Sequence, residues 1–286
     1  MQRIKIDHTT TYRYSCPVRL GEHTLHLRPR EGHDIRIESS SLNISPAFDI
    51  TWQRDVYGNS VAHVSFREPA DVLEIESSVT VEQYEPKVVT QLPLADEAER
   101  YPFDYPPIER IDLVPYQTAA FADASKLLDD WIAVTCPKGD GMGTLDLLAE
   151  LNRRIAEDLD YVARDEPGVQ PPDVTLSRAK GSCRDKSTLF IESCRRCGLA
   201  SRFVSGYLVS SAAVEDLATT HAWAEVYLPG AGWRGFDSTS GQLTGADHIA
   251  VAVHRHPEAI PPVSGTFFGP LEPKPKMTVK VEVLHL

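Results

Sequence analysis

The sequence lacks any apolar run long enough to span a bilayer. Its 286 residues are 42% apolar and 24% charged, an ordinary balance for a folded protein. The first residues, MQRIKIDHTTTYRY, alternate polar and apolar side chains as a strand does, and they lack the apolar region of a signal peptide. These absences predict a cytoplasmic protein that does not insert into a membrane.

Cysteines are also few, and basic residues are outnumbered by acidic ones. Five cysteines, an odd number at irregular spacing, argue against a disulfide framework, so reduced thiols are expected. The formal net charge is −12, whereas nucleic-acid-binding proteins present basic faces, so nucleic acid is not an expected partner. The sequence has no EF-hand-type loop to support calcium activation, and no cofactor is expected.

Residues 1–85 are short alternating runs separated by turn residues, a pattern typical of an antiparallel β-domain. Gly58 and Asn59 both tolerate positive φ, so they predict a hairpin turn. Because no helical period occurs in this block, we expect a β-sandwich. The expected strands are Ile4–Tyr14, His23–Arg28, Ile35–Ile44, Asp49–Val56, Ser60–Phe66 and Val72–Gln83.

Prolines recur through residues 86–115 and predict a domain linker without a regular helix. In residues 116–262 helical patterns are followed by strand patterns, which predicts an α+β domain. Its expected helices include Gln117–Ala133 and Thr144–Leu159, and its expected strands are Ser201–Ser210, Thr220–Leu228 and Trp233–Thr239. Residues 263–286 form a C-terminal extension, and its end, Met277–Leu286, fits a strand of either domain.

A helix predicted over residues 182–197 begins with a cysteine. Ser182 fits the N-cap and Asp185 the third helical position, which together make a capping box. Cys183 then occupies the first turn, where unpaired backbone N–H groups and the helix dipole favour a thiolate. Gly198 fits the position that ends the helix. Cys183 is therefore the predicted nucleophile.

A base and a carboxylate are predicted on a hairpin that follows. His221 lies in the expected strand Thr220–Leu228, and Asp237 lies in the next strand, sixteen positions further on. The two residues lie opposite each other if the turn is centred on Pro229, and they are staggered if it is centred one or two residues later. Either way they share one end of the hairpin. A Cys–His–Asp set needs this proximity, because the imidazole moves the thiol proton and the carboxylate orients the imidazole.

Three segments between Gly181 and Gly241, GSCRDKS, CGLASRFVSGY and HAWAEVYLPGAGWRGFDSTSG, form a dense pattern. They resemble the core of the bacterial transglutaminase-like superfamily, whose pattern is G-x-C-x-D, A-R-x-V-x-G-Y, H-A-W-x-E-V and G-W-x-x-x-D-x-T. The resemblance extends to GADHIAVAV, and TTTYRYSCPVRL, LRPR and RDVYGN are similar to the β-domain that accompanies this core. Ser238 departs from the pattern, which has a proline after the aspartate.

This resemblance implies a papain-like α+β core with Cys183 as nucleophile, His221 as base and Asp237 as orienting carboxylate. It implies a thiol-dependent acyl-transfer enzyme, either a cysteine protease or amidase or a protein-glutamine acyltransferase. Such an enzyme would act on a peptide, a protein or a small amide through a thioester. Tyr161 is a candidate second donor to the oxyanion, beside the Cys183 backbone N–H. Trp223 is a candidate for the substrate cleft, although strand aromatics more often belong to a core.

Two other functions remain open. A non-catalytic binding protein would keep the fold and use its β-domain for partners, although the intact set of three residues argues against it. A metal-dependent hydrolase would use His248, His254 and His256. The sequence shows no hydrogen-bonding partners that would orient these imidazoles toward a metal. Cys194 and Cys197 have the spacing of redox or zinc sites, but they end a helix and have no second pair, so core cysteines are expected.

Overall fold

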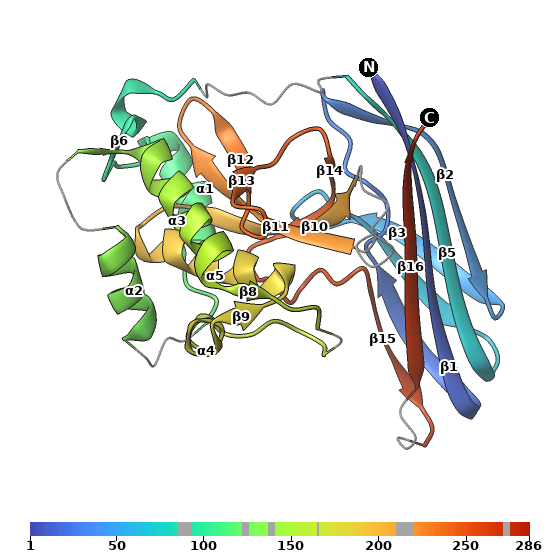
Figure 1. The fold of residues 1–286 in the computed structure, drawn as a ribbon. Helices are drawn as coiled ribbons and strands as arrows, with labels where there is room; N and C mark the ends of the chain where they lie inside the picture. The colour runs from blue at the N-terminus through green and yellow to red at the C-terminus, as the bar shows by residue number, and fades with distance from the viewer. Residues whose placement is uncertain (85–92, 122–125, 137–140, 165, 210–219, 271–274) are drawn as a thin grey trace.

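The computed structural model describes residues 1–84, 93–121, 126–136, 141–164, 166–209, 220–270 and 275–286. These residues form two main sheets, and helices cover one face of the second sheet (Figure 1). The two ends of the chain lie side by side, since Ile4 pairs with His285 across neighbouring strands. Across the described ranges, every helix is too short or too polar to cross a membrane.

The first sheet takes most of its strands from the first 83 residues, in the order β2-β5-β1-β4-β3 with antiparallel neighbours. The strands are β1 (Gln2–Leu25), β2 (Ile35–Ser45), β3 (Phe48–Arg54), β4 (Ser60–Phe66) and β5 (Ala70–Gln83). The predicted hairpin turn is present between β3 and β4, where Gly58 has a φ of 74°. Apolar side chains that alternate along these strands bury a common core.

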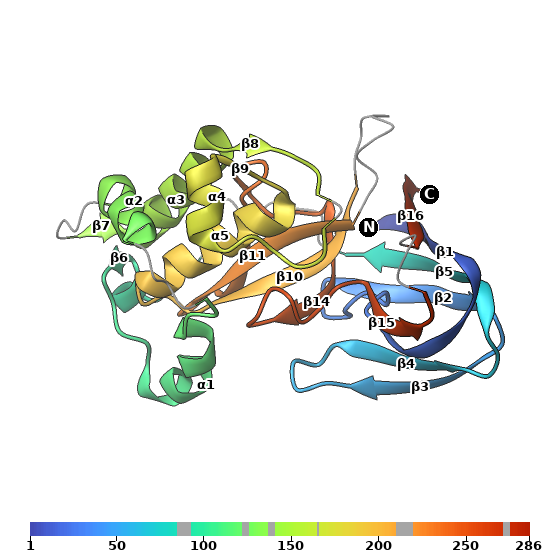
Figure 2. The same cartoon turned by 90° about the horizontal axis from the view of Figure 1, so that it is seen from below.

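The predicted sandwich is not confirmed, because β1 does not break where two separate strands were expected. Its first half pairs with β5 and its last residues pair with β4, so one strand runs through both halves of the sheet. The ladder is irregular between Arg13 and Val18, and the strand bends there. The result is a single strongly curved sheet, a half-barrel, in place of two stacked sheets (Figure 2).

The C-terminal extension completes this first sheet. Both β15 (Val263–Phe268) and β16 (Lys276–His285) pair antiparallel with β1. The terminal strand therefore joins the N-terminal sheet, which settles the two options left by the sequence. The connection through residues 255–262 carries the chain from the second sheet back to the first (Figure 1).

The proline-rich stretch contains a helix, α1 (Pro107–Gln117), which contradicts the prediction that these prolines prevent one. Pro107 is at the first helical position, where a backbone N–H has no intrahelical partner, so the ring costs no hydrogen bond. Pro115 lies in the last turn. The helix predicted over Gln117–Ala133 is also wrong in its bounds, since Gln117 ends α1 and α2 spans Leu127–Thr135.

The second sheet has the order β13-β12-β11-β10-β14, and the helix that begins with Cys183 packs against the central strand β11 and its neighbour β10. Its strands are β10 (Ser201–Leu208), β11 (Thr220–Leu228), β12 (Gly232–Asp237), β13 (Gln242–Leu243) and β14 (His248–His254). The helices are α3 (Thr144–Asp158), α4 (Pro172–Arg178) and α5 (Cys183–Arg196), and α5 is buried along most of its length. Short elements complete the fold, namely η1 (Asp96–Ala98), β6 (Arg100–Tyr101), β7 (Met142–Gly143), β8 (Asp160–Tyr161) and β9 (Lys180–Gly181).

The two sheets meet along β10 and β14. Apolar residues of β1, β5 and β16 form one buried cluster with residues of β10 and β14. Asn59, which is fully buried, donates to the Val253 carbonyl oxygen at 2.9 Å and accepts the Val253 N–H at 2.9 Å. His8 of β1 forms a hydrogen bond of 2.9 Å with the Tyr207 hydroxyl of β10. These contacts support the edge strand β14 from the N-terminal side.

Candidate active site

Cys183 is the first residue of α5, and the predicted capping box precedes it. The Asp185 carboxylate accepts the Ser182 backbone N–H at 2.8 Å and the Ser182 hydroxyl at 2.9 Å. A Cβ on Gly181 would lie 2.8 Å from the Cβ of Asp185, so a glycine is needed where the chain enters the helix. The side chain of Cys183 is 9% exposed.

Asp185 does more than cap the helix. Its other oxygen accepts hydrogen bonds of 2.7 Å from the Arg164 guanidinium and from the Gln170 backbone N–H. Burial acts to raise the pKa of this carboxyl, but these hydrogen bonds and those from Ser182 hold the pKa below its usual value. A fully buried carboxylate therefore fastens Arg164 and Gln170 to the start of α5.

His221 and Asp237 meet across the β11–β12 hairpin. Leu228 pairs with Gly232, so the turn is centred on Gly230 and the two residues are staggered, the second arrangement allowed by the sequence. The His221 Nε2–H donates to the Asp237 Oδ2 at 3.0 Å. The other carboxylate oxygen accepts the Thr239 backbone N–H at 2.9 Å. Asp237 is 2% exposed, so these donors replace water.

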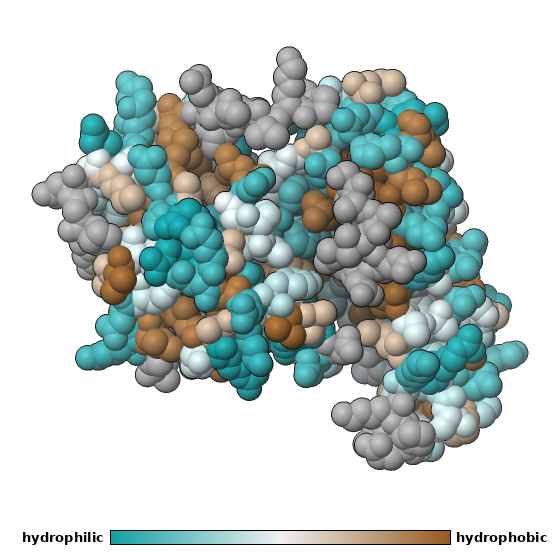
Figure 3. Space-filling model, viewed as in Figure 1, coloured by the Kyte–Doolittle hydropathy of each residue, from teal (hydrophilic) through white to brown (hydrophobic). Residues whose placement is uncertain are grey.

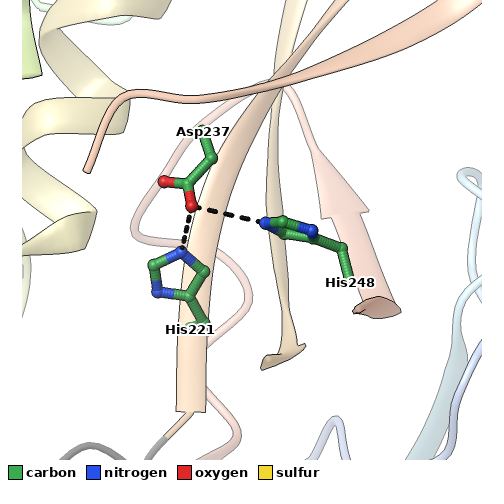
Figure 4. A group of neighbouring side chains, drawn as sticks. All are labelled: His221, Asp237 and His248. Atoms are coloured by element: carbon green, nitrogen blue, oxygen red, sulfur yellow. Dashed lines mark hydrogen bonds and ion pairs between the residues drawn. The ribbon is translucent and has the colours of Figure 1, made fainter. Parts of the chain in front are cut away.

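The structure links Cys183 to this pair through His221. Burial acts to lower the pKa of His221, but hydrogen bonds to Asp237 and to Cys183, with the negative charges of both, raise it to about 10. Because Nε2 faces Asp237, Nδ1 is the ring nitrogen left for the sulfur (Figure 4). The three residues predicted from the sequence therefore lie in one interacting set.

A second imidazole, that of His248, also contacts Asp237. From the sequence this histidine was a candidate only for the alternative metal cluster. The His248 Nε2–H donates to the same oxygen, Oδ2, at 3.3 Å (Figure 4). Burial acts to raise the pKa of Asp237, but the bonds from His221 and His248 hold it far below its usual value. The resembling segment GADHIAVAV contained this histidine, but sequence alone did not show that β14 lies close enough to reach Asp237.

The alternative metal cluster does not assemble. His248 begins β14 and His254 ends it, so the two lie at opposite ends of a seven-residue strand. The Nδ1 of His254 instead accepts the His256 backbone N–H at 2.8 Å. Within the described ranges, the group with metal-ligand proximity is His221, Asp237 and His248, whose ligand atoms lie within 4.8 Å of one another. A metal there would have to displace the two imidazole–carboxylate hydrogen bonds.

The turn after Asp237 is held by α3. The Ser238 hydroxyl donates to the Asn152 side-chain oxygen at 2.8 Å, and the Asn152 amide donates to the Gln242 carbonyl oxygen at 3.0 Å. Both Ser238 and Asn152 are buried. These bonds fix the turn through side chains at the position where the resembling pattern has a proline.

Trp223 was a candidate for lining the substrate cleft, but it is only 2% exposed and packs inside the protein. Its ring meets the ring of His248 edge to face at 5.2 Å between centroids. A Cβ on Gly206 would lie 2.6 Å from the indole, so that glycine lets the indole lie against β10. Tyr161, the candidate oxyanion donor, is 43% exposed, and its strand pairs with β9, just before Cys183. Burial and the charge of Cys183 raise the pKa of Tyr161.

Cys194 and Cys197, which have the spacing of redox or zinc sites, lie at the other end of α5 from Cys183. Cys194 is completely buried in the core between α5 and the sheet, and burial raises its pKa well above the usual value. Cys197 follows at the end of the helix and forms no disulfide. This agrees with the prediction of core cysteines.

A cavity of about 620 Å³ lies in the half-barrel, and no residue of the Cys183 site lines it. Its lining mixes apolar, polar and basic side chains, most of them from β2 and β3, among them Trp52 and Arg54. On the face seen in Figure 3, apolar residues form separate patches among polar ones. Neither feature identifies a substrate.

Two family models match the chain. Residues 4–82 match the model described as bacterial transglutaminase-like N-terminal region, and residues 138–238 match the transglutaminase-like superfamily. An uncharacterized protein of Mycobacterium tuberculosis is 28% identical over 93% of this chain and 88% of its own length. One from Mycobacterium leprae is 26% identical over 94% of both chains.

A solved structure has the same fold over the whole chain. The crystal structure of a putative cysteine protease from Cytophaga hutchinsonii superimposes with a TM-score of 0.74. The two proteins share 18% sequence identity, and the match covers 100% of this chain and 91% of the other. At this identity the likeness concerns the fold alone.

Proposed function

The chain belongs to the bacterial transglutaminase-like superfamily, and on that premise we propose that it is a thiol-dependent acyl-transfer enzyme acting on amide or peptide bonds. Cys183 is the nucleophile, His221 the general acid and base, and Asp237 the orienting carboxylate. The observation that carries this proposal is the position of His221 between Cys183 and Asp237, with its pKa raised to about 10 by both.

The proposed reaction begins with attack of the Cys183 sulfur on the carbonyl carbon of an amide. The carbonyl oxygen becomes an oxyanion as the carbon becomes tetrahedral. The Cys183 backbone N–H has no partner within α5, since it is at the first helical position, and it is available to this oxyanion. Tyr161 is the candidate second donor, because its strand is paired with β9 directly before the nucleophile.

His221 then completes the first half of the reaction. Its proton passes from Nδ1 to the leaving nitrogen, the carbon–nitrogen bond breaks, and a thioester on Cys183 remains. In the second half, His221 takes a proton from water or from an amine, which attacks the thioester carbonyl. Loss of the thiolate releases a carboxylic acid or a new amide and restores the starting sulfur. Asp237 keeps Nε2 protonated throughout, so that Nδ1 is the nitrogen that exchanges protons.

The proposed substrate is a peptide, a protein or a small amide, acted on in the cytoplasm without a metal. Access of water or of an amine to the thioester decides between a protease or amidase and a protein-glutamine acyltransferase. A site built from a thiol, an imidazole and a carboxylate supports either outcome, because both begin with the same thioester.

A substrate panel tests this proposal. The protein is incubated with glutamine peptides and unmodified peptides, with and without a primary amine, and ammonia release and product masses are measured. We expect hydrolysis or amine incorporation by the parent protein, none by Cys183→Ala, and no effect of EDTA on the parent. Full turnover by Cys183→Ala, or loss of turnover in EDTA, would overturn the thiol mechanism. A parent protein inactive across the panel would favour a binding function.

A further inference from the structure

We propose that His248 is a positioning residue for the reaction, holding Asp237 and through it His221 in the orientation that catalysis needs. This inference rests on the proposed function, because it gives His248 a part in the same site. It also makes a claim about the reactivity of the Cys183 thiol that no substrate is needed to test.

The protonation of His248 follows from its two ring contacts. Its Nδ1 accepts the Gly245 backbone N–H at 3.3 Å, and an accepting ring nitrogen carries no proton. The hydrogen of the neutral ring is therefore on Nε2, which is the nitrogen 3.3 Å from the Asp237 carboxylate. His248 thus donates to Asp237 in its neutral form, without needing to be charged.

The imidazole of His248 has a ring contact in addition to the hydrogen bonds at its two nitrogens. The indole of Trp223 meets it edge to face with an interplanar angle of 81°. The indole reaches this position because Gly206, on the strand between β11 and β14, has no Cβ to obstruct it. A ring fixed by a backbone donor, a carboxylate and an indole has little freedom to turn, which suits a residue that positions another.

The effect on Asp237 comes from two donors on one oxygen. His221 approaches Oδ2 from β11 and His248 approaches it from β14, so the carboxylate cannot rotate without breaking two bonds (Figure 4). The Thr239 N–H on Oδ1 holds the second oxygen. Without His248, the carboxylate would keep one imidazole donor, and the His221 ring would lose the fixed partner that sets its tautomer.

The charged and titratable groups that face His248 come from the two strands of the hairpin. Among the residues that the structure describes, they are the Asp237 carboxylate on β12 and the His221 ring on β11, whose centroid is 6.0 Å away. Both belong to the catalytic set. A substitution of His248 should therefore change the reaction rate at Cys183 more than it changes substrate binding.

Three variants test the inference. His248→Ala removes the donor, His248→Gln keeps an amide N–H near the position of Nε2, and His254→Gln is the matched control at the other end of β14. We expect kcat of His248→Ala to fall about 10- to 100-fold with KM nearly unchanged, and His248→Gln to recover part of the loss. His254→Gln should retain the parent kcat. Thermal unfolding of all three confirms that they are folded.

The alkylation rate of Cys183 by iodoacetamide at pH 7 gives the readout that needs no substrate. We expect it to be about 10-fold slower in His248→Ala than in the parent, and unchanged in His254→Gln. Parent-like alkylation and kcat in a folded His248→Ala would overturn the positioning role alone. If Cys183→Ala keeps full turnover, the proposed function fails, but the alkylation comparison still decides whether His248 controls the thiol.

Discussion

Helix α5 carries a cysteine near each end, and the two thiols have different neighbours. Cys183 begins the helix at the edge of the apolar core and forms a hydrogen bond with the His221 imidazole. Cys194 lies in the last turn and a half, wholly buried among apolar side chains, where burial raises its pKa. We therefore expect the reactivity of each thiol to depend on its position along the helix and on the strand residues opposite it.

Each end of the helix also has a buried carboxylate with a separate purpose. Asp185 ties Arg164 and Gln170 to the start of α5. Glu192 pairs with Arg195 at 2.6 Å, and the Arg195 guanidinium also donates to the Ser201 carbonyl oxygen at 3.0 Å. The first carboxylate supports the start of the helix, where Cys183 lies, whereas the second holds the helix against the sheet.

The largest expected difference is between Cys183→Ala and Cys194→Ala. Cys183→Ala should lower kcat/KM by at least about 10⁴-fold, because it removes the atom that forms the thioester, and its unfolding temperature should be close to that of the parent. Cys194→Ala should keep activity and lose about 1 kcal/mol of stability, because it leaves a small cavity in the core. Parallel activity assays and thermal melts measure both. An inactive but stable Cys194→Ala would contradict the comparison.

Asp237→Asn should have a smaller effect than loss of the nucleophile. The asparagine keeps the shape of the side chain but loses the charge that stabilises protonated His221, so we expect kcat to fall about 100-fold. The variant should also label more slowly at Cys183. Steady-state kinetics of Asp237→Asn beside His221→Ala test this order, and an Asp237→Asn variant as inactive as His221→Ala would show that the carboxylate does more than orient.

The pH profile is expected to reflect the raised pKa of His221. This group is protonated below about pH 10, and its proton is needed for the leaving nitrogen. The value of kcat/KM should therefore stay level through pH 9 and fall as the pH rises through about 10. The same raised pKa adds stability that is fully present below the unfolded-state pKa of about 6.5 and is lost as pH rises through 10. An alkaline limb near pH 7 would contradict the hydrogen-bonded set.

The smallest predicted difference in activity is between variants of the two buried carboxylates, Asp185 and Glu192. Asp185→Asn and Glu192→Gln should each cost about 2 kcal/mol of unfolding free energy, since each leaves buried donors or a buried cation without a charged acceptor. Only Asp185→Asn should also slow catalysis, because it loosens the loop beside Cys183. Urea unfolding and kcat of the two variants measure the contrast. Equal loss of kcat in both would show that α5 responds as one rigid unit.

The sequence predicted the start of α5 better than it predicted the N-terminal architecture, for physical reasons. A capping box is local, so Ser182 and Asp185 were sufficient to predict where α5 begins. The β1 strand depends on pairing partners far along the chain, and no local signal showed that it would continue from Gln2 to Leu25. Likewise, the contact of His248 with Asp237 depends on the order of strands in the sheet, which periodicity does not give.

The α1 helix shows a different limit of prediction from sequence. The number of prolines argues against a helix in this stretch, yet Pro107 at the first helical position costs no hydrogen bond. The sequence allows the β11–β12 turn to be centred on Pro229 or one or two residues later, because Gly230 and Gly232 both adopt positive φ in the structure and no local signal separates these centres. The structure selects Gly230 as the centre.

The most direct measurement of the central claim is competitive alkylation of the five cysteines at pH 7. The folded protein is partly labelled with iodoacetamide, digested and mapped by mass spectrometry, while residual activity is followed in the same samples. We predict that Cys183 is labelled much faster than Cys16, Cys136, Cys194 and Cys197, and that activity disappears in step with its labelling. Faster labelling of Cys194 or Cys197, or full activity after Cys183 is labelled, would contradict the account.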